Sequence, residues 1–144
     1  MLKLNLPQYN FKIIESKIYD SIRKKYIALT PEEWVRQNFI QYLINEKNYI
    51  ASLLSIESEI KLGNIKKRCD IIVYKNTIPT VIVECKAPHI EINQTTFDQI
   101  TRYNFALNVK YLMVTNGILH YFCKIDYENK SYSFLTDIPD FKEL

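Results

Sequence analysis

The sequence has little glycine, little cysteine and no long hydrophobic run. Only 2 glycines and 5 prolines occur among 144 residues, so neither a glycine-rich phosphate-binding loop nor a long flexible linker is expected. The 3 cysteines are too few for a disulfide scaffold, and an odd number leaves one unpaired. No apolar run approaches the ~20 residues of a membrane-spanning helix, and the first residues lack the apolar core of a secretion signal. These absences predict a reduced, cytoplasmic protein without a membrane segment.

The excess of charge is also small. The chain carries 19 basic and 16 acidic residues, a formal net charge of +3, which permits an anionic partner without requiring one. Apolar residues make up 47 % of the sequence, an ordinary share for a globular protein. The length and composition predict a single domain spanning residues 1–144.

A helix is predicted to begin at Thr30-Pro-Glu-Glu33 and to run to about Lys47. Thr30 suits the N-cap, Pro31 suits the first helical position, and Glu33 completes a capping box with Thr30. Apolar residues follow helical spacing along two sides of this segment (Val35, Phe39, Tyr42 and Leu43; Ile40 and Ile44). We therefore expect the helix to be packed on more than one side.

The rest of the chain predicts an α/β fold. Apolar and alternating stretches predict strands at 53–61, 68–74 and 78–86, a helix at 94–107, strands at 110–115 and 118–125, and short strands at 11–14, 18–20 and 131–135. The turn Thr115-Asn-Gly117 would join two of these strands. The core order α-β-β-β-α-β-β, over residues 30–126, predicts a mixed sheet with a helix on each face. Residues 1–29 would form a short β extension and residues 127–144 a final strand and tail.

Two acidic residues mark a candidate site. Asp70 lies on one predicted strand and Glu84 on the next, and antiparallel pairing would bring the two carboxylates side by side, with Asp70 on the same face as Ile72. Burying two unpaired carboxylates is costly, and Mg²⁺ is commonly held by such a pair with water molecules. Lys86 would lie ~7 Å beyond Glu84 and could orient water or neutralise a phosphate. The alternative is an exposed polar sheet edge.

Both predicted helices add polar residues to this site. Glu33 could lean over a metal ion, with Arg36 one turn later, or it could serve only to cap the helix. Gln99 and Tyr103 are spaced i, i+4 and are expected on the sheet-facing side of the second helix. They could contact a phosphate, or simply pack against the core.

These residues together resemble a known family. Asp70 followed by Glu84-Cys-Lys86, after an acidic first helix and before Gln99-x-x-x-Tyr103, resembles the PD-(D/E)XK nuclease superfamily. Several stretches are similar to the N-terminal nuclease domain of the R subunit of type I restriction enzymes (Thr30–Gln37, Lys67–Asp70, Val83–Pro88 and Phe97–Tyr103). The resemblance covers roughly residues 30–126. Cys69 stands where the motif name has proline, at a position that does no chemistry.

The resemblance implies a restriction-endonuclease-like fold and Mg²⁺-dependent (or Mn²⁺-dependent) hydrolysis of DNA phosphodiester bonds. Glu33, Asp70, Glu84 and the backbone carbonyl of Cys85 would bind the metal. Lys86 would be the catalytic lysine, and Gln99, Tyr103 and Arg36 would be accessory residues. The alternative function is a non-catalytic module of the same fold that binds DNA or a protein, and a hydrolase of another substrate is a third.

Other features bear on binding partners. Two basic clusters could contact DNA phosphates, or be solvated charge runs (Arg23, Lys24 and Lys25; Lys66, Lys67 and Arg68). Cys69, Cys85 and His89 match no standard zinc spacing, so the cysteines are interpreted as small buried thiols. A separate motor or recognition protein is a possible partner, and the sequence leaves monomer and homodimer open.

Overall fold

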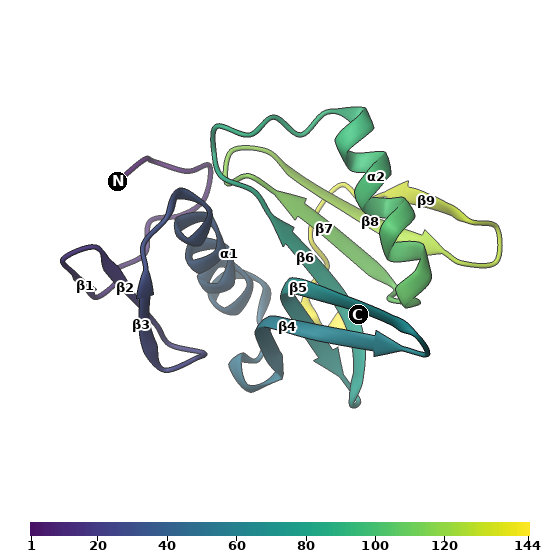
Figure 1. Cartoon of the computed structure of the whole chain (residues 1–144), viewed down its shortest axis with the longest axis horizontal. Helices are drawn as coiled ribbons and strands as arrows, with labels where there is room; N and C mark the ends of the chain where they lie inside the picture. The colour runs from purple at the N-terminus through teal and green to yellow at the C-terminus, as the bar shows by residue number, and fades with distance from the viewer.

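A computed structural model describes all 144 residues of the chain. Its centre is a six-stranded sheet in the order β4-β5-β6-β7-β8-β9, in which only β6 and β7 are parallel. The strands are β4 (Leu54–Leu62), β5 (Ile65–Lys75), β6 (Ile78–Cys85), β7 (Tyr111–Thr115), β8 (His120–Asp126) and β9 (Ser131–Phe134). Helix α1 (Pro31–Lys47) covers one face and helix α2 (Gln94–Asn104) the other (Figure 1). The predicted restriction-endonuclease-like order of helices and strands is confirmed.

A second, three-stranded sheet lies beside α1, on the side away from the main sheet (Figure 1). It is an antiparallel meander of β1 (Ile13–Ile14), β2 (Lys17–Asp20) and β3 (Lys25–Ala28). The sequence predicted a β extension here but not β3, because the basic residues before it were interpreted as a charge cluster. This meander buries the side of α1 that faces away from the main sheet.

Helix α1 begins and ends as its sequence directs. The Thr30 hydroxyl accepts a hydrogen bond from the backbone N–H of Glu33 (3.1 Å), and Pro31 occupies the first turn. Asn48 ends the helix in the left-handed conformation, with φ of 62°. The expected packing on more than one side is confirmed: apolar side chains face the main sheet, and polar side chains are also buried (Val35, Phe39, Ile40 and Leu43; Glu33, Arg36 and Gln37).

Strand β6 is buried on both faces. Val81 and Val83 pack in the core under α1, whereas Ile82 packs with Phe97 and other residues under α2. Each such buried side chain stabilises the fold by roughly 1.5–3 kcal/mol relative to exposure. The two cores hold β6 rigidly, so the residues at its end, Glu84 and Cys85, lie on a fixed support.

The structure corrects several element boundaries. Helix α2 ends at Asn104, and residues Phe105–Leu107 continue as a 3₁₀ turn that tightens before the left-handed Asn108. The connection between β7 and β8 covers residues 116–119 rather than a two-residue turn. Gly117 there has φ of +86°, and a Cβ on it would lie 2.8 Å from the Leu4 side chain. Only glycine fits this position without a shift of the N-terminal segment.

The longest helix, α1, and the shorter α2 both fail the length and hydropathy requirements of a membrane-spanning helix.

Candidate functional site

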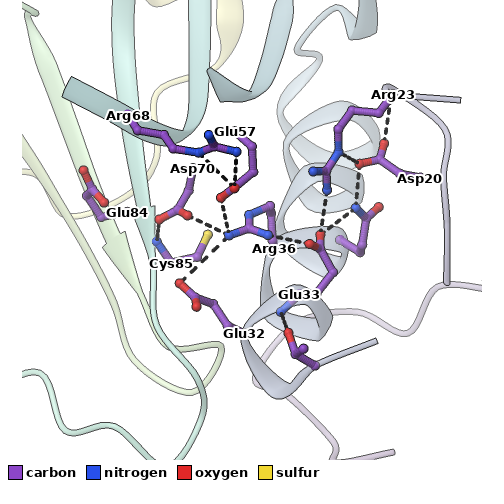
Figure 2. Close-up of polar contacts among 12 residues, drawn as sticks. Asp20, Arg23, Glu32, Glu33, Arg36, Glu57, Arg68, Asp70, Glu84 and Cys85 are labelled. Atoms are coloured by element: carbon purple, nitrogen blue, oxygen red, sulfur yellow. Dashed lines mark hydrogen bonds and ion pairs between the residues drawn. The ribbon is translucent and has the colours of Figure 1, made fainter. Parts of the chain in front are cut away.

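Asp70 lies where β5 and β6 separate. Their pairing ends at Ile71 opposite Val83, so the next residues along each strand are no longer paired with each other. Asp70 Oδ2 fills this opening and accepts a hydrogen bond from the backbone N–H of Cys85 (2.8 Å). Asp70 Oδ1 accepts one from Arg36 Nη2 of α1 (2.7 Å; Figure 2). Both oxygens of this carboxylate therefore have fixed directions.

The expectation that Asp70 shares a face with Ile72 is wrong. Ile72 packs in the core under α2, whereas Asp70 is bonded to α1. The alternation is broken because Glu57, between the residues of β4 that pair with Ile71 and Cys69, has a left-handed φ of 52°. This irregularity in β4 turns the Glu57 side chain toward α1 as well.

Glu84 is the second carboxylate of the site and is nearly enclosed. Its side chain is 13 % exposed, and its one ion-pair partner is the Lys67 ammonium from β5. Burial raises the pKa of Glu84, the Lys67 ammonium opposes that effect, and the neighbouring Asp70 carboxylate adds to it, so the pKa stays above its ordinary value. Glu84 is therefore a buried acid with too little positive charge around it.

Arg36 occupies the centre of the acidic cluster. Nη1 donates to Glu33 (2.5 Å), and Nη2 donates to Asp70 (2.7 Å) and Glu57 (2.9 Å). Glu32 lies 3.9 Å from the same nitrogen. Burial alone would lower the pKa of Arg36, but Asp70 and Glu33 raise it overall, so the guanidinium stays charged. Arg36, predicted as an accessory residue, therefore neutralises several carboxylates of the cluster at once.

Glu33 does not reach the Asp70–Glu84 pair. One of its oxygens accepts from Arg36, and the other accepts from Arg23 (3.1 Å) and Gln37 (3.0 Å). Figure 2 shows it directed toward Asp20 and Arg23, away from Asp70. This placement corrects the expectation that Glu33 leans over a metal ion, because both of its oxygens already accept hydrogen bonds from arginine or glutamine side chains inside the protein.

Sequence reasoning missed two carboxylates that do face Asp70. Glu32 lies one position earlier on α1, and its pKa is raised, first by burial and then by the Asp70 charge. Glu57 bonds both Arg36 and Arg68 (2.9 Å each). The sequence showed two adjacent glutamates at the start of α1. It could not show which of the two faces Asp70, because the rotation of the helix about its axis was not known. Nothing local identified Glu57, since its orientation depends on the irregularity in β4.

Lys86 lies just after β6, and its backbone N–H donates to the Thr115 carbonyl (2.8 Å). Its side chain is half-buried and forms no ion pair. Its charge lowers the pKa of Glu32, against the larger effects of burial and Asp70, so the ammonium lies beside the acidic cluster. Lys86 therefore lies near several carboxylates but forms an ion pair with none of them.

Gln99 and Tyr103 are exposed, which corrects the expectation that they face the sheet. The residues of α2 buried against the sheet are Phe97, Thr101 and Asn104. Tyr103 is 55 % exposed, and its ring lies 4.9 Å from the Lys67 ammonium. Tyr103 therefore borders the site through Lys67 rather than through the core, whereas the Gln99 side chain is exposed and forms no hydrogen bond with the site.

The basic clusters are divided between internal and external roles. Arg23 bonds Asp20 and Glu33, Lys67 pairs with Glu84, and Arg68 pairs with Glu57. The Arg23 and Lys67 side chains are largely buried in these pairs, at 19 % and 14 % exposed, whereas that of Arg68 is 66 % exposed and remains at the surface. The remaining members are exposed and form no ion pair (Lys24, Lys25 and Lys66).

The donor set suits a divalent cation at Asp70 and Glu84 and no larger ligand cage. No group of three or more His, Cys, Asp or Glu side chains comes together as a metal site. Mg²⁺ needs only one or two carboxylates beside water and substrate oxygens. The Asp70–Glu84 pair has two internal cations, Arg36 at Asp70 and Lys67 at Glu84, and Arg36 is shared with Glu33 and Glu57.

The cysteines are buried free thiols, as expected. Burial raises the pKa of Cys69 to about 12, which keeps the thiol protonated and unreactive.

Residues 31–139 match the family described as "Type I restriction enzyme R protein N terminus". A solved structure with a similar fold is described as a fragment of an HsdR subunit of a type I restriction enzyme from Vibrio vulnificus YJ016. It is 21 % identical, with a TM-score of 0.49, and the match covers 73 % of this chain but only 22 % of that one. No curated protein sequence matches the chain.

Proposed function

This chain belongs to the family of type I restriction enzyme R protein N termini, and from that premise we propose that it is a metal-dependent nuclease acting on DNA. The observation that carries the proposal is the Asp70–Glu84 pair at the point where β5 and β6 separate. One of its acids is nearly enclosed and insufficiently neutralised. Glu84 accepts a hydrogen bond from Lys67 alone, whereas a carboxylate has about four acceptor positions.

Asp70, Glu84 and the carbonyl of Cys85 would hold the cation, which is Mg²⁺ or Mn²⁺. When bound, such an ion supplies a water of lowered pKa and stabilises charge on phosphoryl oxygens. Arg36 and the Cys85 N–H fix the direction of Asp70, so the ligand needs no reorganisation.

Lys86 is the proposed catalytic lysine. Because no carboxylate holds its ammonium, that group is free to donate a hydrogen bond to the attacking water or to a phosphate oxygen. The charge of Lys86 lowers the pKa of Glu32, as expected of an ammonium near the acidic cluster. Glu33 is not proposed as a ligand here, since its oxygens are bonded to arginine and glutamine side chains.

The test is cleavage of plasmid and single-stranded DNA with Mg²⁺, with Mn²⁺ and with chelator. The variant Lys86→Ala is compared with Lys124→Ala. Lys124 is an exposed lysine on β8, which is separated from β6 by β7. We expect metal-dependent cutting by the parent and by Lys124→Ala, and at least ~100-fold less by Lys86→Ala. If no protein cuts while all remain folded, the nuclease proposal fails and a binding module becomes the better interpretation.

A further inference from the structure

The side chain of Lys67 is directed into the protein, which its membership of an exposed basic cluster does not explain. It begins on β5 among exposed basic residues, yet its ammonium is directed inward to the Glu84 carboxylate. The Lys67 side chain is only 14 % exposed and that of Glu84 13 %. The pair is therefore nearly removed from water, where an ion pair is strong but where each charge depends on the other.

The second basic side chain of the site cannot replace Lys67 at Glu84. The two terminal nitrogens of the Arg36 guanidinium are shared among Glu33, Glu57 and Asp70, and it forms no ion pair with Glu84. Lys67 is thus the single internal counter-ion of the Glu84 carboxylate, and Arg36 is that of Asp70.

We propose that Lys67 is a removable counter-ion: it neutralises Glu84 until a divalent cation binds at Asp70 and Glu84, and it then leaves Glu84 while staying at the Tyr103 ring, where it binds a DNA phosphate. This inference rests on the proposed function, because it assigns a competitor to the same cation site. An ammonium and a divalent cation on one buried carboxylate repel each other, so they compete for it.

The ammonium already has a second contact besides Glu84. The Tyr103 ring lies 4.9 Å from Lys67 Nζ in the same side-chain position and is itself 55 % exposed, so it can hold the ammonium at the border with solvent once Glu84 releases it. Lysine suits such a movement because its charge is compact and its stem is flexible, whereas the planar Arg36 is fixed by several bonds. Exposed Lys66 adds positive charge next to it on β5.

The movement would couple two binding events. A cation at Glu84 releases a positive charge toward the surface, so cation binding should strengthen DNA binding, and DNA should strengthen cation binding by the same factor. If Lys67 had a purely structural role at Glu84, the strength of this coupling would not depend on Lys67.

The primary experiment is calorimetric titration of Mn²⁺ into the whole chain without DNA. We expect Lys67→Met to bind Mn²⁺ about tenfold more tightly than the parent, because the competing charge is gone. The matched control Lys66→Met removes the same charge from the neighbouring, unpaired position, and we expect its affinity to stay within twofold. Lys67→Arg keeps the charge and should not gain affinity.

A second readout uses a fluorescent DNA duplex, with Ca²⁺ or with chelator, and follows anisotropy. The parent should bind DNA several-fold more tightly in Ca²⁺, and Lys67→Met should lose that increase. Unchanged or weaker Mn²⁺ binding by a folded Lys67→Met protein would overturn the competition. If neither the parent nor any variant binds Mn²⁺, the cation site itself is absent, and the proposed function fails with it.

Discussion

Two groups of buried carboxylates lie on opposite sides of α1 and are neutralised in opposite ways (Figure 2). On one side Asp20 of β2 is fully buried, and it accepts hydrogen bonds from the backbone of Ile22 and Arg23 and from the side chains of Arg23 and Gln37. On the other side the Asp70–Glu84 pair has fewer donors than acceptor positions. The contrast separates a structural acid from a candidate functional one.

The buried carboxyl groups on the two sides of α1 also differ in how readily they lose a proton. Burial would raise the pKa of Asp20, but the hydrogen bonds from Arg23, Gln37 and Ile22 outweigh it, so the pKa is lowered. For Glu84 burial prevails over Lys67, and the pKa is raised. A carboxylate whose oxygens already accept several hydrogen bonds gains little from a bound cation. A carboxylate with few donors is stabilised when a cation binds.

Replacing the two aspartates gives the largest expected difference. Asp70→Asn should reduce metal-dependent DNA cleavage by about 10²–10³-fold or more while the protein stays folded. Asp20→Asn should leave cleavage per folded molecule unchanged. Cleavage assays normalised by circular dichroism would measure both, and equal losses from the two substitutions would erase the distinction between the groups.

The stability of the fold should depend more on Asp20 than on Asp70, the reverse of their expected effects on cleavage. Asp20→Asn leaves Arg23 without its nearest carboxylate and weakens a buried network, so the free energy of unfolding should fall by about 3 kcal/mol. Urea denaturation in chelator would measure this. A loss below about 0.5 kcal/mol would mean that the Asp20 network is not what fixes the N-terminal sheet to α1.

The opposite pKa shifts predict opposite pH dependence. Asp20, with a lowered pKa, contributes stability above its unfolded pKa that is lost as pH falls through its folded value. Glu84, with a raised pKa, is most favourable at low pH, and the metal-free protein loses that contribution as pH rises through the folded value. The double variant Lys67→Met/Glu84→Gln leaves neither charge of the pair unpaired, so its melting temperature in chelator should fall less than that of the parent between pH 4 and pH 7. An equal fall in both proteins would show that Glu84 does not contribute to the pH dependence.

The smallest effect concerns DNA binding by the meander. Lys24→Gln and Lys25→Gln remove exposed charges and should each lower the salt dependence of DNA binding by about one ion. Arg23→Gln, one residue earlier, should instead reduce stability, since Arg23 holds Asp20 and Glu33. Anisotropy at several salt concentrations, alongside thermal melts, would separate these roles.

The sequence predicted the parts of the fold that depend on local signals. The cap at Thr30, the double-faced burial of Val81-Ile-Val83 and the order of helices and strands follow from short patterns, and the structure has them. It did not predict which side of a helix faces the site. Glu33 was preferred to Glu32, and Gln99 with Tyr103 was placed inward, because a helical spacing fixes relative positions but not the absolute rotation against a sheet. Glu57 depended on a left-handed residue within β4, which no local pattern marks.

The most direct test of the central distinction is a calorimetric Mn²⁺ titration of the parent, Asp70→Asn and Asp20→Asn proteins under identical conditions. The parent and Asp20→Asn should bind Mn²⁺ with similar affinity, and Asp70→Asn should not bind it measurably. Equal binding by the parent and Asp70→Asn, or loss of binding in Asp20→Asn alone, would contradict the assignment of the cation site to the Asp70–Glu84 pair.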